Sequence, residues 1–254
     1  MLKILLSGAC GRMGRQVAAL AGDAQAVIIA GVDVHPEQGA SFPVYPAFSL
    51  VQEEADVLVD FSRPEGLSAL LPYARARKMP VVLAATGYNE ADLAAIRDAA
   101  GEIPIFRSAN LSLGVYVLKA LSRQAAPLLP GFDIEIVEKH HNQKIDAPSG
   151  TALMLYDAVQ HPGNQPVFGR NGRTQKREPN EIGIHAIRGG TVAGQHEVGF
   201  YGPGESLLIT HAAQDRSIFA RGALRAAHFI RGQAPGEYDM AALADDMVGG
   251  QGNC

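Results

Sequence analysis

The sequence is poor in cysteine, carries little excess charge and has no long hydrophobic run. Only Cys10 and Cys254 occur among 254 residues, so a disulfide framework is not expected and a Cys-x-x-Cys metal site is excluded. The formal net charge of −4 gives no reason to expect bulk attraction to nucleic acid or to an anionic membrane. No run of 18 apolar residues free of charge occurs, so we expect no membrane-spanning helix.

The hydrophobic segment at residues 1–6 is too short to be a signal peptide. Gly8 follows it at once, and Arg12 and Arg15 lie just behind, which is typical of a buried first strand. Because cysteine is scarce and no membrane span is expected, the sequence indicates a cytoplasmic protein.

The first half of the chain alternates short apolar runs with helical segments. This alternation predicts an α/β fold with a Rossmann-like, doubly wound parallel sheet covered by helices on both faces. The predicted strands cover residues 2–6, 27–32, 56–61, 80–84 and 103–106, and the predicted helices cover 12–20, 65–77 and 89–100.

The pattern changes after about residue 112 and predicts a second, α+β domain with an open mixed or antiparallel sheet. Residues 133–139 alternate polar and apolar side chains, as in a strand with one exposed face. We place the first domain at 1–113, completed by 215–254, and the second at 114–214. The remaining predicted elements are helices over 114–126 and 217–231, strands over 182–188, 196–201 and 206–211, a mobile loop over 162–179 and a frayed tail over 248–254.

A glycine-rich segment follows the first predicted strand and opens the first helix. Gly8 permits a tight turn, Gly11 lets the backbone approach a pyrophosphate, and Gly14 lets the helix pack closely on the strand. Asp33, just after the second strand, can accept hydrogen bonds from an adenosine ribose and would repel a 2′-phosphate. These residues predict dinucleotide binding and favour NADH over NADPH.

Other interpretations of the glycine segment stay open. It could be a turn without a ligand, or part of a mononucleotide or S-adenosylmethionine pocket, and Arg12 or His35 could contact a 2′-phosphate. The small residues at 84–87 and 109–112 follow two further strands, where the nicotinamide half could lie against backbone, although plain turns would have the same composition.

The segment 138–152 gathers side chains suited to proton transfer and anion binding. His140, His141 and Lys144 supply proton donors and positive charge, which the reduction of a conjugated imine carrying carboxylates would use. Ser149 is the predicted N-cap of a helix whose N-terminus would bind a carboxylate. The alternative is a solvated polar loop before a capped helix. Zinc binding is disfavoured, because adjacent histidines on an extended segment point apart and no third ligand is evident.

This segment, together with the glycine loop, resembles the signature of the 4-hydroxy-tetrahydrodipicolinate (dihydrodipicolinate) reductase family. The resemblance extends over nearly the whole chain. The matching segments are 8–14, 60–65, 109–112, 138–152, 188–196, 209–211, 219–222 and 238–240.

The resemblance implies a reductase that uses NADH or NADPH to convert a cyclic dicarboxylate imine to tetrahydrodipicolinate, in the diaminopimelate route to lysine. It also implies a homotetramer assembled through the sheets of the second domain. It makes His140 a proton donor or acceptor and Lys144 a proton donor, with substrate carboxylate bound by His141, Gly150 and Thr151. The residues that would line the cofactor are Gly8, Ala9, Cys10, Gly11, Arg12, Met13, Asp33, Ala84, Ala85, Thr86, Ala109, Asn110, Leu111 and Ser112.

Two departures from the family pattern bear on the cofactor. Ala84 and Ala85 stand where the family usually has Gly-Thr, which removes a hydroxyl near the expected nicotinamide position. Val34 stands where many relatives place an arginine, which weakens the case for NADPH. We interpret His196 as a structural or interface residue, and Arg216 as a candidate that could reach the substrate pocket.

Two other functions remain as alternatives at this point. A different nicotinamide enzyme acting on an amino-acid-derived imine should lack the carboxylate site at 146–151, which is present. A catalytically silent dinucleotide sensor would not need both His140 and Lys144.

Overall fold

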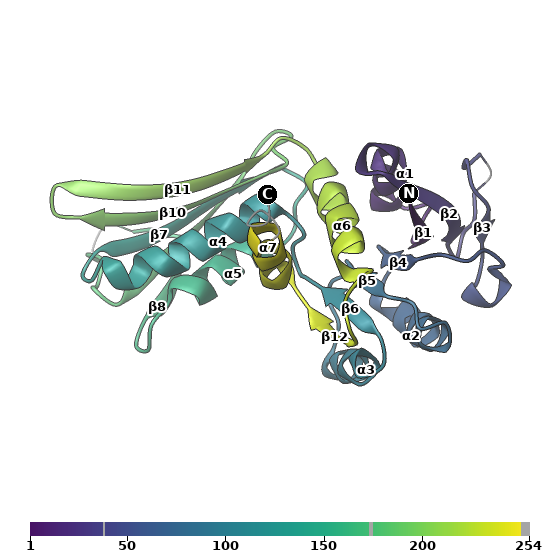
Figure 1. The fold of residues 1–254 in the computed structure, drawn as a ribbon. Helices are drawn as coiled ribbons and strands as arrows, with labels where there is room; N and C mark the ends of the chain where they lie inside the picture. Colours follow the sequence, from purple (N-terminus) through teal and green to yellow (C-terminus); the bar gives the residue numbers. More distant parts are fainter. Residues whose placement is uncertain (38, 173–174, 250–254) are drawn as a thin grey trace. The chain divides into compact units, whose positions relative to one another are not determined.

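The chain divides into two compact units (Figure 1). The first comprises Met1–Leu113 and the chain from Ser217 onward, and the second comprises Gly114–Arg216. The structure is a computed structural model, and it describes residues 1–37, 39–172 and 175–249. Within these residues, no helix is both long enough and apolar enough to cross a membrane.

The first unit is built on a parallel sheet with the strand order β12-β6-β5-β4-β1-β2-β3. The order reverses between β1 and β4, which makes this a doubly wound sheet and confirms the predicted fold class. The strands are β1 (Leu2–Ser7), β2 (Ala26–Val32), β3 (Val44–Tyr45), β4 (Val57–Asp60), β5 (Val81–Leu83), β6 (Pro104–Arg107) and β12 (Gly236–Tyr238).

Helices cover this sheet, which explains why its central strands read as apolar runs. On one face, Leu5 and Leu58 of the strands share a core with Leu70 of α2 and Ile96 of α3, all without solvent exposure. Helix α1 packs against α6. The helices are α1 (Arg12–Leu20), α2 (Leu67–Ala76), α3 (Glu90–Ala100), α6 (Ser217–Ile230) and α7 (Met240–Gly249).

The second unit contains a mixed sheet with the order β11-β10-β7-β9-β8. Strand β9 is parallel to both β7 and β8, and β10 is antiparallel to both β7 and β11. The elements are α4 (Leu113–Ala125), β7 (Asp133–His140), α5 (Gly150–Val159), β8 (Gln165–Phe168), β9 (Glu181–Arg188), β10 (Gly194–Gly202) and β11 (Glu205–Ala213).

The alternation predicted for 133–139 separates the two faces of β7. Ile136 packs with Leu155 of α5 and Leu118 of α4 in a buried core, and Glu138 and His140 point to the same side of the sheet. Residues Asp133, Glu135, Val137 and Lys139 occupy the opposite face. The polar residues of the buried face lie toward the end of the strand, beyond the apolar core.

Two expectations about irregular segments were wrong in part. The predicted mobile loop 162–179 contains β8, which pairs in parallel with β9, and the Arg177 guanidinium bonds Asp133 and Glu135 of β7. Its polar composition concealed a short strand that pairs with β9, the next strand along the chain. The predicted frayed tail begins inside α7, which runs to Gly249, and residues 250–254 lie outside the described residues. Strands β3 and β12 were not predicted.

Candidate active site

The glycine loop between β1 and α1 has the close backbone packing that its spacing predicts. Gly8 has a φ of +73°, and a Cβ there would lie 2.7 Å from the Phe61 carbonyl oxygen. A Cβ on Gly14 would lie 2.2 Å from the Gly8 carbonyl oxygen, so only glycine lets α1 pack this closely on the loop. Gly11 is the N-cap of α1, and no side chain caps that terminus. A helix N-terminus without a side-chain cap suits a phosphate.

Asp33 is bound to the same loop. Its Oδ2 accepts the Cys10 N–H at 2.9 Å and its Oδ1 accepts the His35 N–H at 3.0 Å. The carboxylate therefore lies directly beside the glycine turn, at the carboxyl end of β2. This is the position from which an acidic side chain binds the ribose of a dinucleotide.

The other predicted cofactor residues lie at the carboxyl ends of neighbouring parallel strands. Ala84 follows β5, and its N–H donates to the Asp60 carbonyl oxygen at the end of β4. The segment 109–112 follows β6, and there the Asn110 side chain accepts the Ser112 N–H at 2.9 Å. Because β1, β2, β4, β5 and β6 are parallel, these loops share one edge of the sheet. The residues present therefore fit a dinucleotide.

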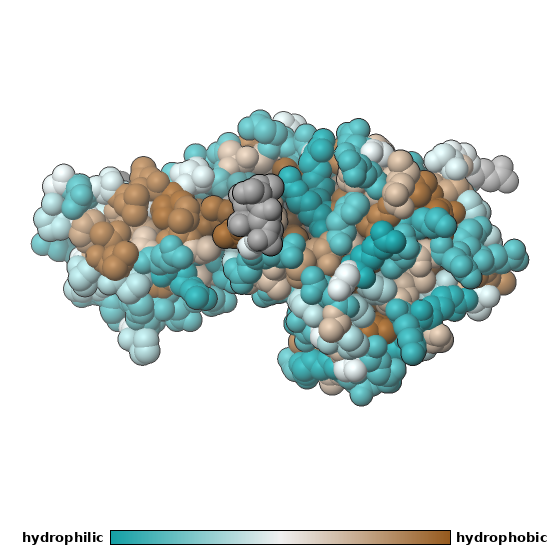
Figure 2. All heavy atoms as spheres, in the orientation of Figure 1, coloured by the Kyte–Doolittle hydropathy of each residue, from teal (hydrophilic) through white to brown (hydrophobic). Residues whose placement is uncertain are grey.

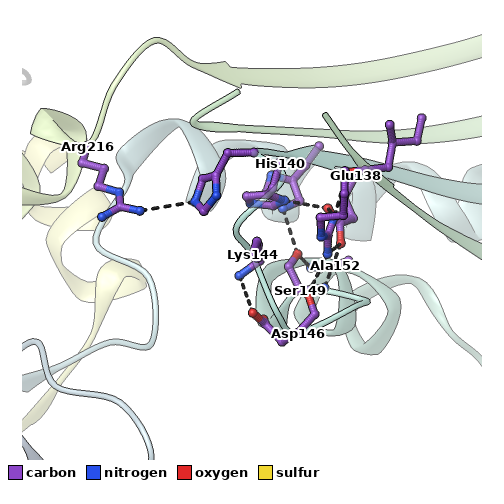
Figure 3. A network of polar contacts seen from close by, with 11 residues as sticks. Glu138, His140, Lys144, Asp146, Ser149, Ala152 and Arg216 are labelled. Carbon is purple, nitrogen blue, oxygen red and sulfur yellow. Dashed lines mark hydrogen bonds and ion pairs between the residues drawn. The ribbon is translucent and has the colours of Figure 1, made fainter. Parts of the chain in front are cut away.

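In the second unit, a buried polar cluster lies where β7, β9 and β10 meet the start of α5 (Figure 3). At its centre is Glu138, whose side chain has no solvent exposure. Arg188 of β9 donates two hydrogen bonds to it, from Nη1 to Oε2 at 2.7 Å and from Nη2 to Oε1 at 2.8 Å. Ser149 N–H donates to Oε1 at 2.9 Å. Although burial opposes the charged carboxylate, the hydrogen bonds from Arg188, His140 and Ser149 lower the pKa of Glu138.

His140 is the third residue that contacts the Glu138 carboxylate. Its Nδ1 lies 2.6 Å from Glu138 Oε2, and its side chain is almost fully buried. An ionised carboxylate only accepts hydrogen bonds, so Nδ1 carries the proton and Nε2 of the neutral ring has its lone pair available. Burial lowers the pKa of His140, which favours this neutral form, although the charge of Glu138 acts in the opposite direction.

Ser149 connects this cluster to the N-terminus of α5, as the sequence predicts. Its Oγ caps the helix by accepting the Ala152 N–H at 3.2 Å, and it lies 3.1 Å from Nε2 of His196. His196 is buried, with its ring centroid 5.1 Å from that of His140, and burial lowers its pKa to about 4. Next in the helix, a Cβ on Gly150 would meet no neighbouring atom within 4 Å, so there is space beside the terminus.

The predicted lysine and second histidine lie on the segment between β7 and α5. Lys144 Nζ donates to Asp146 Oδ1 at 2.8 Å, and this contact lowers the pKa of Asp146. His141 Nε2 lies 3.3 Å from Nη2 of Arg216. A guanidinium only donates, so the His141 nitrogen is the acceptor. Within the described residues, no group of three or more His, Cys, Asp or Glu side chains is arranged to hold a metal ion.

Comparison with known proteins decides the family. A family model described as the N-terminus of dihydrodipicolinate reductase matches residues 2–111, and the model for the C-terminus of the same enzyme matches residues 114–243. The chain belongs to the dihydrodipicolinate reductase family. The resemblance inferred from the sequence is therefore confirmed.

The relatives of this family member match it over almost their full length. The 4-hydroxy-tetrahydrodipicolinate reductase of Caldanaerobacter subterraneus subsp. tengcongensis is 51% identical over 247 residues, covering 96% of this chain and 98% of the relative. The reductase of the same name from Clostridium tetani is 44% identical over 250 residues, covering 96% and 97%.

Solved structures share the fold of this reductase family member. A dipicolinate-bound dihydrodipicolinate reductase from Paenisporosarcina sp. TG-14 has a TM-score of 0.78 at 20% identity, covering 94% of this chain and 97% of that one. A probable dehydrogenase from Thermotoga maritima has a TM-score of 0.62 at 11% identity, covering 98% and 95%. Both comparisons support the fold described above.

Sequence reasoning missed three members of the polar cluster of this reductase. Glu138 and Arg188 lay inside matching segments but received no role, and His196 was interpreted as structural or as an interface residue. The available signal was the inward face of the alternating strand: Glu138 and His140 share it, and Arg188 faces His140 in the β7–β9 register.

Proposed function

We propose that this chain is a 4-hydroxy-tetrahydrodipicolinate reductase, which reduces the cyclic dicarboxylate imine to tetrahydrodipicolinate in the diaminopimelate route to lysine. The observation that carries this proposal is the buried Glu138–His140 pair next to the Ser149-capped N-terminus of α5, in a chain of this family. A proton-transfer group and an anion-binding helix terminus are what a carboxylated imine requires.

The substrate carboxylate would bind at the start of α5. The backbone N–H groups of Gly150 and Thr151 lie in the first turn, where the helix dipole favours an anion. His141 and Lys144 would add hydrogen bonds and positive charge from the preceding segment. Dipicolinate, which occupies the Paenisporosarcina relative, has the same pair of carboxylates and should compete with substrate here.

Proton transfer would use His140 and Lys144. The Nε2 lone pair of His140 can accept a proton, and the protonated ring can return it, while the Lys144 ammonium can donate one directly. NAD(P)H, when bound, supplies the hydride that adds to one carbon of the conjugated imine. The positive charge of Lys144 would stabilise the electron pair displaced toward the ring nitrogen until protonation completes the reduction.

We propose that the first unit binds the nicotinamide cofactor through the 14 residues that the sequence identified. The uncapped α1 terminus at Gly11 supports a pyrophosphate site, and Asp33 supports a ribose site that favours NADH. Val34, in place of an arginine, leaves no cation at that position for a 2′-phosphate. Paired kinetics with NADH and NADPH test the preference, and a lower KM for NADPH would contradict it.

We further propose that the second unit binds substrate and assembles a cytoplasmic homotetramer. Figure 2 shows hydrophobic side chains gathered on this unit, and several of its large apolar residues are exposed. These include Val117 and Leu121 of α4, Ile187 of β9, Tyr201 of β10 and Leu208 of β11. Such exposed area is typical of a surface that a partner covers. Sedimentation equilibrium should give the mass of four chains, and a monomer would contradict this part.

A coupled assay tests the activity itself. The upstream synthase generates the imine in the cuvette, and the fall in NADH absorbance reports its reduction. We expect NADH consumption that depends on both the synthase and this protein and that dipicolinate inhibits competitively. If folded protein consumes neither NADH nor NADPH, the proposed function is wrong.

A further inference from the structure

Glu138 contacts two groups that have proposed roles in the reaction, but Glu138 itself has so far been given no role. Its carboxylate contacts His140 through Oε2 and the backbone N–H of Ser149 through Oε1. One oxygen thus faces the group proposed for proton transfer, and the other faces the cap of the helix proposed to bind the substrate carboxylate. No solvent reaches the side chain to replace either contact.

We propose that Glu138 is the positioning residue of this enzyme, fixing the Nδ1–H tautomer of His140 and tying that ring to the N-terminus of α5. Arg188 holds the carboxylate by a bidentate contact and also donates from Nη2 to the Asp146 carbonyl oxygen at 2.6 Å. The inference rests on the proposed function for the role of His140, but the tautomer can be measured without it.

The surroundings of His140 explain why the tautomer matters. A Cβ on Gly194 would lie 3.1 Å from His140 Nε2, so the glycine leaves room on the side of the ring that has the lone pair. The charged or titratable groups around the ring are Glu138 on its own strand, Lys144 on the following segment, Arg188 of β9 and His196 of β10. Among these, Glu138 is the group that accepts the Nδ1 proton. Without it, the proton could move to Nε2 and block proton acceptance there.

Glu138→Gln reverses this arrangement with little change of shape. If the amide oxygen keeps the Ser149 N–H and Arg188 Nη2, the amide NH2 loses the contact with Arg188 Nη1, faces His140 and donates to Nδ1. The opposite orientation would lose both of those donors. The ring proton is then expected on Nε2. Since general acid–base catalysis contributes about 100-fold to 10,000-fold, kcat should fall about 100-fold. KM should change little, because the helix cap is retained.

A matched control exists on the same strand. Glu135 of β7 also pairs with a histidine and an arginine, His185 at 2.8 Å and Arg177 at 3.1 Å, but on the opposite face of the sheet. Glu135→Gln should leave kcat and the tautomer of His140 unchanged. Gel filtration of both variants checks that they keep the oligomeric state of the wild type.

The decisive readout is ¹⁵N NMR of histidine-labelled protein without ligands, with the His140 signals assigned from a His140→Asn variant. We expect Nδ1–H in the wild type and Nε2–H in Glu138→Gln. The pH profile of kcat should also shift to lower pH in this variant, because the charge of Glu138 raises the proton affinity of His140.

An Nε2–H tautomer in the wild type overturns the inference, and so does a Glu138→Gln variant with wild-type kcat. If Glu138→Gln does not fold, the wild-type spectrum alone still decides the tautomer. Failure of the proposed function would look different: the wild type would show no NADH oxidation whatever its tautomer.

Discussion

Replacing Arg188 with methionine should show how strongly an unpaired buried charge in the cluster destabilises the fold. The substitution removes both guanidinium contacts to Glu138 and leaves the buried carboxylate with Ser149 and His140 as partners. Removing one partner of a buried ion pair costs about 3–5 kcal/mol of folding free energy. We expect the free energy of unfolding of the second unit to fall by this amount, measured by circular dichroism during urea denaturation.

A matched control separates burial from charge. Arg170→Met removes the same type of side chain from a more exposed pair with Glu181, which should lower the folding free energy far less. The double variant Arg188→Met, Glu138→Gln should recover part of the loss, because no uncompensated charge remains. If Arg188→Met is as mild as Arg170→Met, or the double variant is no more stable than the single one, the reasoning fails.

The pH dependence of this loss has a definite sign. The contacts from Arg188 help to lower the pKa of Glu138 in the folded state, so their stabilisation is fully present above the unfolded pKa of 4.5. It is lost as the pH falls through the lower, folded-state pKa. The stability difference between wild type and Arg188→Met should therefore be largest near neutral pH and shrink in acid. A difference that grows with acidification would contradict the assignment.

Three further substitutions test the remaining site. Lys144→Ala should lower kcat about 100-fold or more while the fold persists, whereas Lys139→Ala, on the opposite face of β7, should not; unchanged turnover would remove the role of Lys144. Asp33→Ala should raise the Kd for NADH more than that for NADPH, measured by fluorescence titration, and equal losses would contradict the ribose site. Gly14→Ala places a Cβ 2.2 Å from the Gly8 carbonyl oxygen and should lower the Tm and weaken dinucleotide binding, so an unaffected Tm would argue against the close packing of α1.

The parts of the fold that could be predicted are those with a local signature. The alternation of apolar runs and helices predicted the first sheet, and the glycine spacing located the α1 loop. The strict alternation at 133–139 predicted a strand with two different faces, and Ser149 predicted the start of α5. Each of these patterns involves residues that lie close together in the sequence.

What could not be predicted depends on register between distant strands. Glu138 and Arg188 are 50 residues apart in sequence and meet only because β7 and β9 pair in parallel. Periodicity alone gives no such register. Strand β8 was missed for another reason: it is a short strand within a polar segment, and its pairing with β9 leaves no local signature. His196 was placed in a strand, but its contact with Ser149 required the fold.

Direct hydride transfer to the substrate ring is the central claim, and isotope labelling tests it most directly. The synthase-coupled reaction is run with NADH deuterated at C4 of the dihydronicotinamide, and the product is read by mass spectrometry. C4 carries two hydrogens, one on each face of the ring, and we expect one deuterium in tetrahydrodipicolinate when the label is on one of these two faces. A product without deuterium from either face, or no NADH oxidation by the folded protein, would contradict the account.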